Sequence, residues 1–189
     1  MKKQNWNAVQ EAAEFKRPAP GGYIARIINV EDNEEKEYLK LEYDFAEGKF
    51  KGYYAELYKA KAFWGGSFIR SYKEKALPFF KSFKTCLEVS NRGYFFEEDR
   101  LDDMCGKLIG IVLGEEEYRK NDGSIGNRLY VAQTRSVKSI QDGDFKVPDL
   151  KKLVPTASMI PTAAATPSYG NYGGGSGFTD LNDDGPLPF

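Results

Sequence analysis

Positively charged and aromatic side chains are interleaved over one stretch of the sequence, residues 59–84. This stretch holds seven Lys and Arg residues against one Glu, together with seven aromatic residues. A single nucleic-acid strand offers two general handles, a row of phosphates that attracts cations and exposed base faces that stack on rings. The stretch therefore predicts contact with an unpaired strand through Lys59, Lys61, Phe63, Trp64, Phe68, Arg70, Tyr72 and Lys73. Trp64 is the sharpest candidate, because Gly65, Gly66 and Ser67 follow it in an expected loop.

Two neighbouring segments add further candidates of the same chemistry. Tyr54 and Tyr58 lie close in sequence to Lys49 and Lys51, and we expect at least one tyrosine to face outward and contact the strand. Arg119, Lys120 and Arg128 surround a turn that we expect to join two strands. Ordinary solvated charge is an equally good interpretation of that last group.

The elements that position these residues can be read from periodicity. Residues 38–45 alternate between apolar and charged side chains, which predicts a half-buried strand. Residues 23–30 are rich in Ile and Val and predict a strand before it, and residues 50–58 predict a strand after it, closing a hairpin. Residues 59–106 show mostly helical spacing, with Pro78 beginning a helix that Phe79, Phe80 and Phe83 would seat on the sheet. Two further strands, 108–118 and 128–137, flank a turn at 121–124.

The predicted order of elements is three strands, a helical insertion and two further strands. We therefore expect a mainly β fold: a five-stranded barrel like the oligonucleotide-binding (OB) fold, with its helix between strands three and four. In barrels of this type the surface of strands two and three binds oligonucleotides, which would place the tyrosines on a binding floor. A small β-sandwich remains open as the alternative architecture.

The last part of the chain differs in composition from the rest. Residues 156–189 contain no Lys, Arg or Glu and are rich in Gly, Pro, Thr and Ala, so we expect a disordered tail after a globular domain of residues 1–155. Residues 5–16 allow a short amphipathic helix. The tail ends in an acidic and apolar tip with a terminal ring and carboxylate, which a partner can bind with a pocket and a basic residue. The tip residues are Asp180, Asp183, Asp184, Pro188 and Phe189.

Composition argues against several classes of enzyme. The chain has no histidine, so it has no Ser-His-Asp or Cys-His machinery, and it contains no GxxxxGK[ST] phosphate loop. Cys86 and Cys105 are expected as reduced thiols, and no cofactor or metal site is expected. A nuclease would need converging carboxylates, and consecutive residues Glu115–Glu116–Glu117 of a strand point to alternate faces. No long apolar stretch is present, so we expect a cytoplasmic protein without a membrane partner.

The ending DDGPLPF, residues 183–189, resembles the acidic tip of bacterial single-stranded DNA-binding proteins, in which aspartates precede a final Pro-Phe. It departs from that pattern by inserting Gly185, Pro186 and Leu187 before the last pair. The body, from PAPGGYIARI at residues 18–27 to YLKLEYDFAEGKFKGYY at residues 38–54, is similar to a family of phage and prophage proteins encoded among replication and recombination genes. The resemblance implies single-stranded DNA binding in the host cell cytoplasm and partner binding by Asp183, Asp184, Pro188 and Phe189.

These observations favour a non-catalytic protein that coats single-stranded DNA and recruits replication or recombination proteins through its tip. Two alternatives stay open: a metal-dependent nuclease, and an adaptor whose body binds protein rather than nucleic acid. The oligomeric state, including a homo-oligomer, is likewise left open by the sequence.

Overall fold

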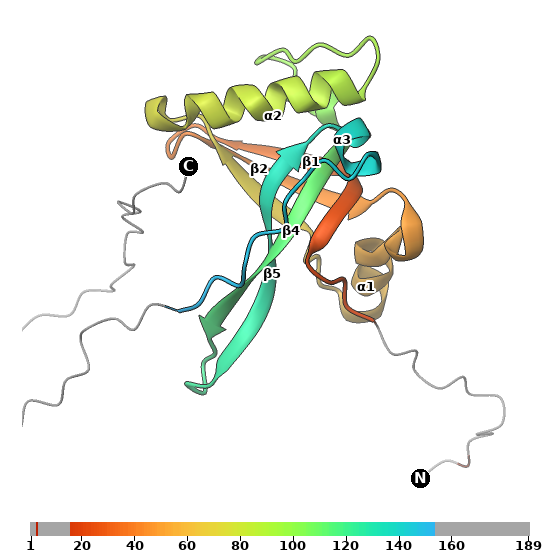
Figure 1. Cartoon of the computed structure of the whole chain (residues 1–189), viewed down its shortest axis with the longest axis vertical. Coiled ribbons are helices and arrows are strands. Elements are labelled where there is room, and N and C mark those ends of the chain that lie inside the picture. The colour runs from red at the N-terminus through yellow and green to blue at the C-terminus, as the bar shows by residue number, and fades with distance from the viewer. Residues whose placement is uncertain (1–2, 4–15, 154–189) are drawn as a thin grey trace, which may run out of the picture. The chain divides into compact units, whose positions relative to one another are not determined.

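A computed structural model describes residue 3 and residues 16–153 of the chain (Figure 1). Its centre is a five-stranded antiparallel sheet in the order β3-β2-β1-β4-β5. The strands are β1 (Gly21–Asn33), β2 (Tyr38–Phe45), β3 (Ser67–Ser71), β4 (Leu108–Arg119) and β5 (Ile125–Arg135). The helices are α1 (Tyr53–Lys61), α2 (Leu77–Ser90) and the short α3 (Val137–Gln141), with 3-10 turns at Gly48–Phe50, Glu74–Ala76 and Leu101–Met104. The prediction of a mainly β fold with five strands is confirmed.

The sheet is open, so the predicted barrel is not observed. β3 and β5 form its two edges, and no hydrogen-bonded ladder joins them within the described residues. α2 packs against both edges: the ring of Phe83 lies 6.4 Å from that of Phe68 on β3, and Cys86 Sγ lies 3.8 Å from the carbonyl oxygen of Thr134 on β5. The gap between the edges is therefore covered by a helix, where a closed barrel would have strand pairing.

β1 and β2 carry the part of the fold that the sequence predicts best. β2 has the predicted bounds, and its alternation places Leu39, Leu41 and Tyr43 in the core. β1 is longer than predicted and has a bulge between Ile27 and Asn29, and it pairs with both β2 and β4. This shared strand holds the two halves of the sheet together.

The predicted third strand, residues 50–58, is wrong. This segment forms a 3-10 turn followed by the helix α1, and the third strand is Ser67–Ser71, in a region whose spacing suggested a helix. Gly52 precedes α1 with a left-handed φ of 73°, a conformation that glycine adopts readily and that turns the chain out of the sheet. The carboxylate of Asp44 then accepts the backbone N–H groups of Tyr54 and Ala55. Tertiary capping therefore overrides the strand preference of the tyrosines.

α2 confirms the predicted helix between strands three and four, but Phe79, which was expected to help seat the helix on the sheet, is 57% exposed. Pro78 lies in its first turn, where a missing backbone N–H costs nothing, and Phe83 and Leu87 are fully buried on its inner face. They belong to one hydrophobic cluster with Met104 of the 3-10 turn Leu101–Met104 and Ile109 of β4. In Figure 1 the helix crosses one end of the sheet.

The opposite face of β4 is covered by α3 and the segment that follows it. A side chain at Gly110 would come within 2.5 Å of Ile140 of α3, so glycine is needed for this close approach. The chain then returns to β4, where Lys151 bridges to Glu116 in parallel orientation. Among the described residues, no helix has the length and apolar character that crossing a membrane requires.

Candidate nucleic-acid interface

Three aromatic rings gather at the surface where α1 ends. Tyr58 lies one turn after Tyr54 on α1 and is 55% exposed, and Phe63 in the following loop is 61% exposed. The ring of Trp64 is partly buried and lies 6.3 Å from that of Tyr58 and 6.2 Å from that of Tyr54. Tyr58, Phe63 and Trp64 are named the α1 rings here. They present aromatic surface to solvent while one of them is anchored on the core.

The loop after α1 fixes the anchored ring. Ala62 ends the helix in the left-handed conformation, with φ of 51°, and its N–H donates to the carbonyl of Tyr58 at 2.7 Å. Trp64 Nε1 donates to the carbonyl of Gly66 at 3.1 Å, and that same carbonyl accepts the N–H of Tyr43 at 2.8 Å. A Cβ at Gly66 would lie 2.3 Å from the backbone oxygen of Tyr43, so only glycine fits. The indole is thus tied to β2 through one backbone position.

Four predicted lysines surround the α1 rings along the chain: Lys49, Lys51, Lys59 and Lys61, all of them exposed. Lys59 pairs with Glu56 at 2.9 Å, and this hydrogen bond raises the pKa of Lys59. Both side chains are well exposed, so the pair is weak and a competing phosphate can replace it. Lys49 lies 4.9 Å from the centre of the Phe50 ring. The segment from Lys49 to Trp64 therefore combines cations with ring faces, as the sequence predicts.

Two predicted contact residues are instead part of the core. Tyr54 and Phe68 are each 7% exposed. Tyr54 stacks on Phe45 with ring centres 5.4 Å apart and meets Tyr43 edge to face. The two residues support the exposed rings but offer little surface of their own to a ligand.

A second group of predicted residues lies at the far end of β3. Arg70 is partly buried, with its guanidinium 4.8 Å from the centre of the Phe68 ring and Nη1 donating to the carbonyl of Ile69. Burial lowers the pKa of Arg70 to about 10. The Tyr72 hydroxyl donates to Asp32 Oδ1 at 2.8 Å, and Lys73 is exposed beside it.

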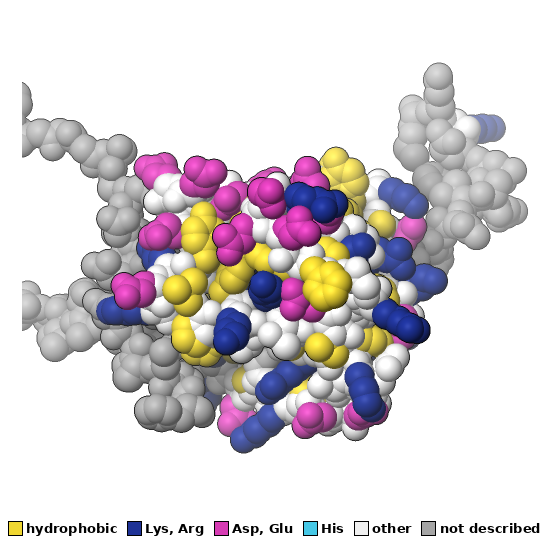
Figure 2. Space-filling view, turned by 90° about the horizontal axis from the view of Figure 1, so that it is seen from above, with side chains coloured by type: hydrophobic (Ala, Val, Ile, Leu, Met, Phe, Trp, Pro, Cys, Tyr) yellow, Lys and Arg dark blue, Asp and Glu magenta, His cyan; other side chains and the backbone are white. Residues whose placement is uncertain are grey.

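The third group lies on the β4–β5 hairpin, which projects from the body of the sheet (Figure 1). Arg128 Nε contacts Glu116 Oε1 at 2.7 Å, and its guanidinium lies 5.6 Å from the centre of the Tyr118 ring. Arg119 donates to the carbonyl of Gly123, and Lys120 is exposed. The predicted residues thus form three separate groups. Figure 2 views the end capped by α2, where basic, acidic and hydrophobic side chains are interspersed.

The expected binding floor on strands two and three has a different composition. The outer face of β2 and β3 carries Lys40, Glu42 and the 54% exposed Ile69, since the tyrosines lie on α1. Lys40 is held by Glu31 at 3.0 Å and by Glu42 at 3.9 Å. Among the described residues of these two strands, the one lysine on this face is thus paired with acids, and the one ring is the partly buried Tyr38.

A hollow of about 830 Å³ at the loop between α2 and β4 was not predicted from the sequence, and four basic and three acidic residues line it. Arg26, Arg92 and Lys107 line it and form no ion pair with the described residues, and Lys107 lies 5.0 Å from the centre of the Tyr94 ring. The Tyr94 hydroxyl is buried without a described hydrogen-bond partner, and burial raises its pKa to about 12. Phe95 beside it is 75% exposed. Arg92, Tyr94 and Phe95 also combine a cation with aromatic rings, but they lie outside residues 59–84, where the sequence pattern is strongest.

The carboxylates considered for a nuclease each bind within the protein. Glu115 approaches Arg17 at 4.0 Å, Glu116 binds Arg128, and Glu117 accepts the backbone N–H of Leu153. Groups of three or more metal-type ligands do not occur among the described residues. The helix expected at residues 5–16 falls almost wholly outside the described residues, and the tip residues lie entirely outside them.

Comparisons with models of known protein families and with curated proteins find no match to this chain.

Proposed function

We propose that this chain is a non-catalytic, sequence-independent single-stranded DNA-binding protein of phage replication and recombination. It protects unpaired DNA and recruits partner proteins through its acidic C-terminal tip. The observation that carries the proposal is the exposure of Tyr58 and Phe63 beside Trp64, on a segment that also bears Lys51, Lys59 and Lys61.

The chemistry of this surface suits an unpaired strand. Each base that stacks on an aromatic ring contributes about 1 to 3 kcal/mol, and every base has a face, so such binding does not read sequence. Lysines nearby neutralise the phosphates that join the stacked bases. Duplex DNA offers the phosphates but keeps its bases stacked internally, so it should bind much more weakly.

The strand connectivity supports a finer proposal, that the open sheet is a relative of the OB fold. β1 pairs with both β2 and β4, and α2 lies between strands three and four. The OB fold is itself a partly open five-stranded barrel whose loop between strands four and five contacts oligonucleotides. In this proposal Arg119, Lys120 and Arg128 of the β4–β5 hairpin supply that contact.

Tryptophan fluorescence tests the proposal. The chain has two tryptophans, so Trp6→Phe leaves Trp64 as the single reporter. We expect a thirty-nucleotide single strand to quench this emission, and the matching duplex to bind at least about tenfold more weakly.

Two variants locate the site. Tyr58→Ala combined with Phe63→Ala should weaken single-strand binding by about tenfold or more, since two stacking surfaces are lost. Phe79→Ala, which removes a ring of similar exposure (57%) on α2, should change affinity much less. Equal affinity for duplex and single strand, or absence of binding at low salt, overturns the proposed function.

A further inference from the structure

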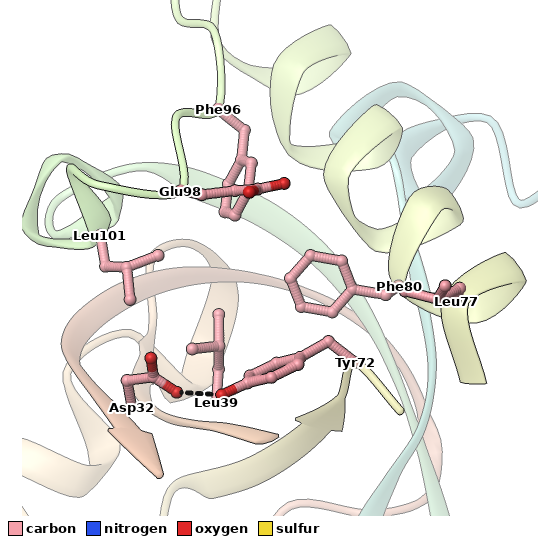
Figure 3. A pocket seen from close by; sticks show the side chains of 8 residues that line it. All are labelled: Asp32, Leu39, Tyr72, Leu77, Phe80, Phe96, Glu98 and Leu101. Atoms are coloured by element: carbon pink, nitrogen blue, oxygen red, sulfur yellow. Dashed lines mark hydrogen bonds between the residues drawn. The ribbon is translucent and has the colours of Figure 1, made fainter. Parts of the chain in front are cut away.

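A cavity of about 320 Å³ lies beyond the far end of β3, apart from the α1 rings (Figure 3). Its wall is formed by three aromatic rings and by leucines, and its only charged groups are two carboxylates. The lining residues are Asp32, Leu39, Tyr72, Leu77, Phe80, Phe96, Glu98 and Leu101. Figure 3 shows Glu98 and Phe96 on one side of the cavity, Asp32 and the Tyr72 hydroxyl on the other, and Phe80 along the flank between them.

The rings of this cavity are held in fixed orientations. Phe80 meets Tyr72 edge to face at 6.1 Å and Phe96 at 5.7 Å. The Tyr72 hydroxyl donates its hydrogen to Asp32, which fixes the phenol ring. The pKa of Tyr72 is raised to about 12, by desolvation first and then by the hydrogen bond to Asp32, so this donor keeps its proton at neutral pH. The cavity is therefore preformed, with flat apolar surfaces.

Its polar groups can only accept hydrogen bonds. An ionised carboxylate is an acceptor, and the one hydroxyl hydrogen in the lining is already used by Asp32. Glu98 forms no hydrogen bond or ion pair with any described residue. A matching occupant is flat and apolar on its faces and carries N–H groups at its edge.

We propose that this cavity binds one unstacked base of the bound strand and prefers bases with an amino edge, cytosine over thymine. The proposal rests on the proposed function. Cytosine presents an N4 amino group that donates to Asp or Glu, whereas thymine presents a carbonyl oxygen at the same ring position. The thymine O4 and the carboxylate are both hydrogen-bond acceptors, so they would repel each other. The preference adds to binding at the α1 rings, which accept any base.

The position of the cavity suits a strand that already contacts the α1 rings. β3 begins three residues after Trp64 and ends immediately before Tyr72, and its five residues span about 17 Å. A bound strand can follow this sheet edge from Trp64 to the cavity, over a few nucleotides. Lys81 and Lys84 line an adjoining hollow together with Glu74, and this hollow shares Leu77, Phe80, Phe96 and Glu98 with the cavity. The two lysines place positive charge where the phosphates of a strand bound in the cavity would lie.

Two oligonucleotides of equal length test the proposal, one of deoxycytidine and one of thymidine, since the two bases differ at the amino position. We expect the wild-type chain to bind the cytosine strand about 5- to 10-fold more tightly by fluorescence anisotropy at pH 8. The double variant Asp32→Asn/Glu98→Gln places amide donors in the cavity, so the ratio of dissociation constants should fall to about 1. Both side chains are exposed, so folding should be retained.

A matched control separates hydrogen bonding from bulk charge. Glu35→Gln/Asp99→Asn removes the same two charges from exposed residues outside the cavity, and it should keep the wild-type ratio. Equal binding of both oligonucleotides by the wild-type chain, or an unchanged ratio in the Asp32→Asn/Glu98→Gln variant, overturns the base pocket and leaves the proposed function standing. Absence of binding to either strand overturns both.

Discussion

The carboxylate of Asp44, near the end of β2, accepts the backbone N–H of Tyr54 in the first turn of α1 at 2.9 Å. It also accepts the N–H groups of Phe45 and Ala55, and the residue is only 6% exposed. Gly52 at the start of the helix has no side chain with which to cap it. An N-cap residue usually accepts these N–H groups with its own side chain. In α1 the N-cap is Gly52, so Asp44 on β2 takes this role.

Replacing Asp44 by Ala should lower the free energy of unfolding by about 2 kcal/mol, because buried N–H groups of α1 lose their acceptor. Urea denaturation followed by circular dichroism measures the change. Glu47→Ala, at an exposed position in the same connection, serves as the control and should stay within about 0.5 kcal/mol of the wild type. If Asp44→Ala matches the control, the cap does not hold α1 in place.

The contrast between β2 and α1 explains how much of the fold the sequence could predict. β2 has an alternating pattern that depends only on neighbouring residues, so its bounds could be read directly. α1 depends on a carboxylate ten residues away and on the backbone of Gly52, and local tyrosines point to a strand instead. β3 was missed for the same kind of reason: its five residues are defined by pairing with β2.

The candidate site was predictable in composition but not in arrangement. The lysine-rich and aromatic stretch, residues 59–84, contains the exposed Phe63 and the partly buried Trp64, and the exposed Tyr58 directly precedes it. Spacing alone could not show that Phe68 and Tyr54 turn inward, because a strand and a helix bury residues with different periods and both elements were assigned the wrong type. The cavity at Tyr72 is lined by residues of β1, β2, α2, the segment after β3 and the connection before β4, and no local pattern brings Asp32 to Glu98.

The salt dependence of DNA binding should show whether the lysines near the α1 rings contact phosphates. If the wild-type chain neutralises about four phosphates, the logarithm of its affinity should fall with the logarithm of salt at a slope of roughly −3. Lys51→Gln combined with Lys61→Gln should reduce the magnitude of this slope by about 1.4, since each phosphate contact contributes about 0.7. Fluorescence titrations at several salt concentrations measure it.

Lys138→Gln is the control for that experiment, because Lys138 lies on α3 and pairs with Asp142. Its slope should equal that of the wild type. An undiminished slope in the Lys51 and Lys61 double variant would place the phosphate contacts elsewhere on the molecule.

Desolvation of the Tyr72 hydroxyl, together with its hydrogen bond to Asp32, predicts a pH dependence at alkaline pH. The pKa of Tyr72 rises from 10.0 to about 12, so the folded chain holds this proton more tightly than the unfolded chain does. The resulting stabilisation is complete below pH 10 and is lost as the pH rises through 12. The difference in unfolding free energy between the wild type and Tyr72→Phe should therefore shrink across this window.

Absorbance at 295 nm gives a direct measurement of the same ionisation. Subtracting the titration of Tyr72→Phe from that of the wild type should leave a single step near pH 12, and in the Asp32→Asn background that step should move toward 10. A step that stays near 10 in the wild-type difference would mean that Tyr72 is not paired with Asp32 in solution.

Removing residues 180–189 should separate partner recruitment from DNA binding. The deletion takes away Asp180, Asp183, Asp184 and the terminal Pro188–Phe189 pair, so repulsion of phosphates falls and single-strand affinity should be unchanged or several-fold tighter. Capture of replication or recombination proteins on immobilised chain should be lost. A tip with the same ten residues in scrambled order keeps the charge, so it should retain wild-type DNA affinity and still fail to capture partners. Weaker DNA binding after the deletion would assign the tip to the DNA site itself.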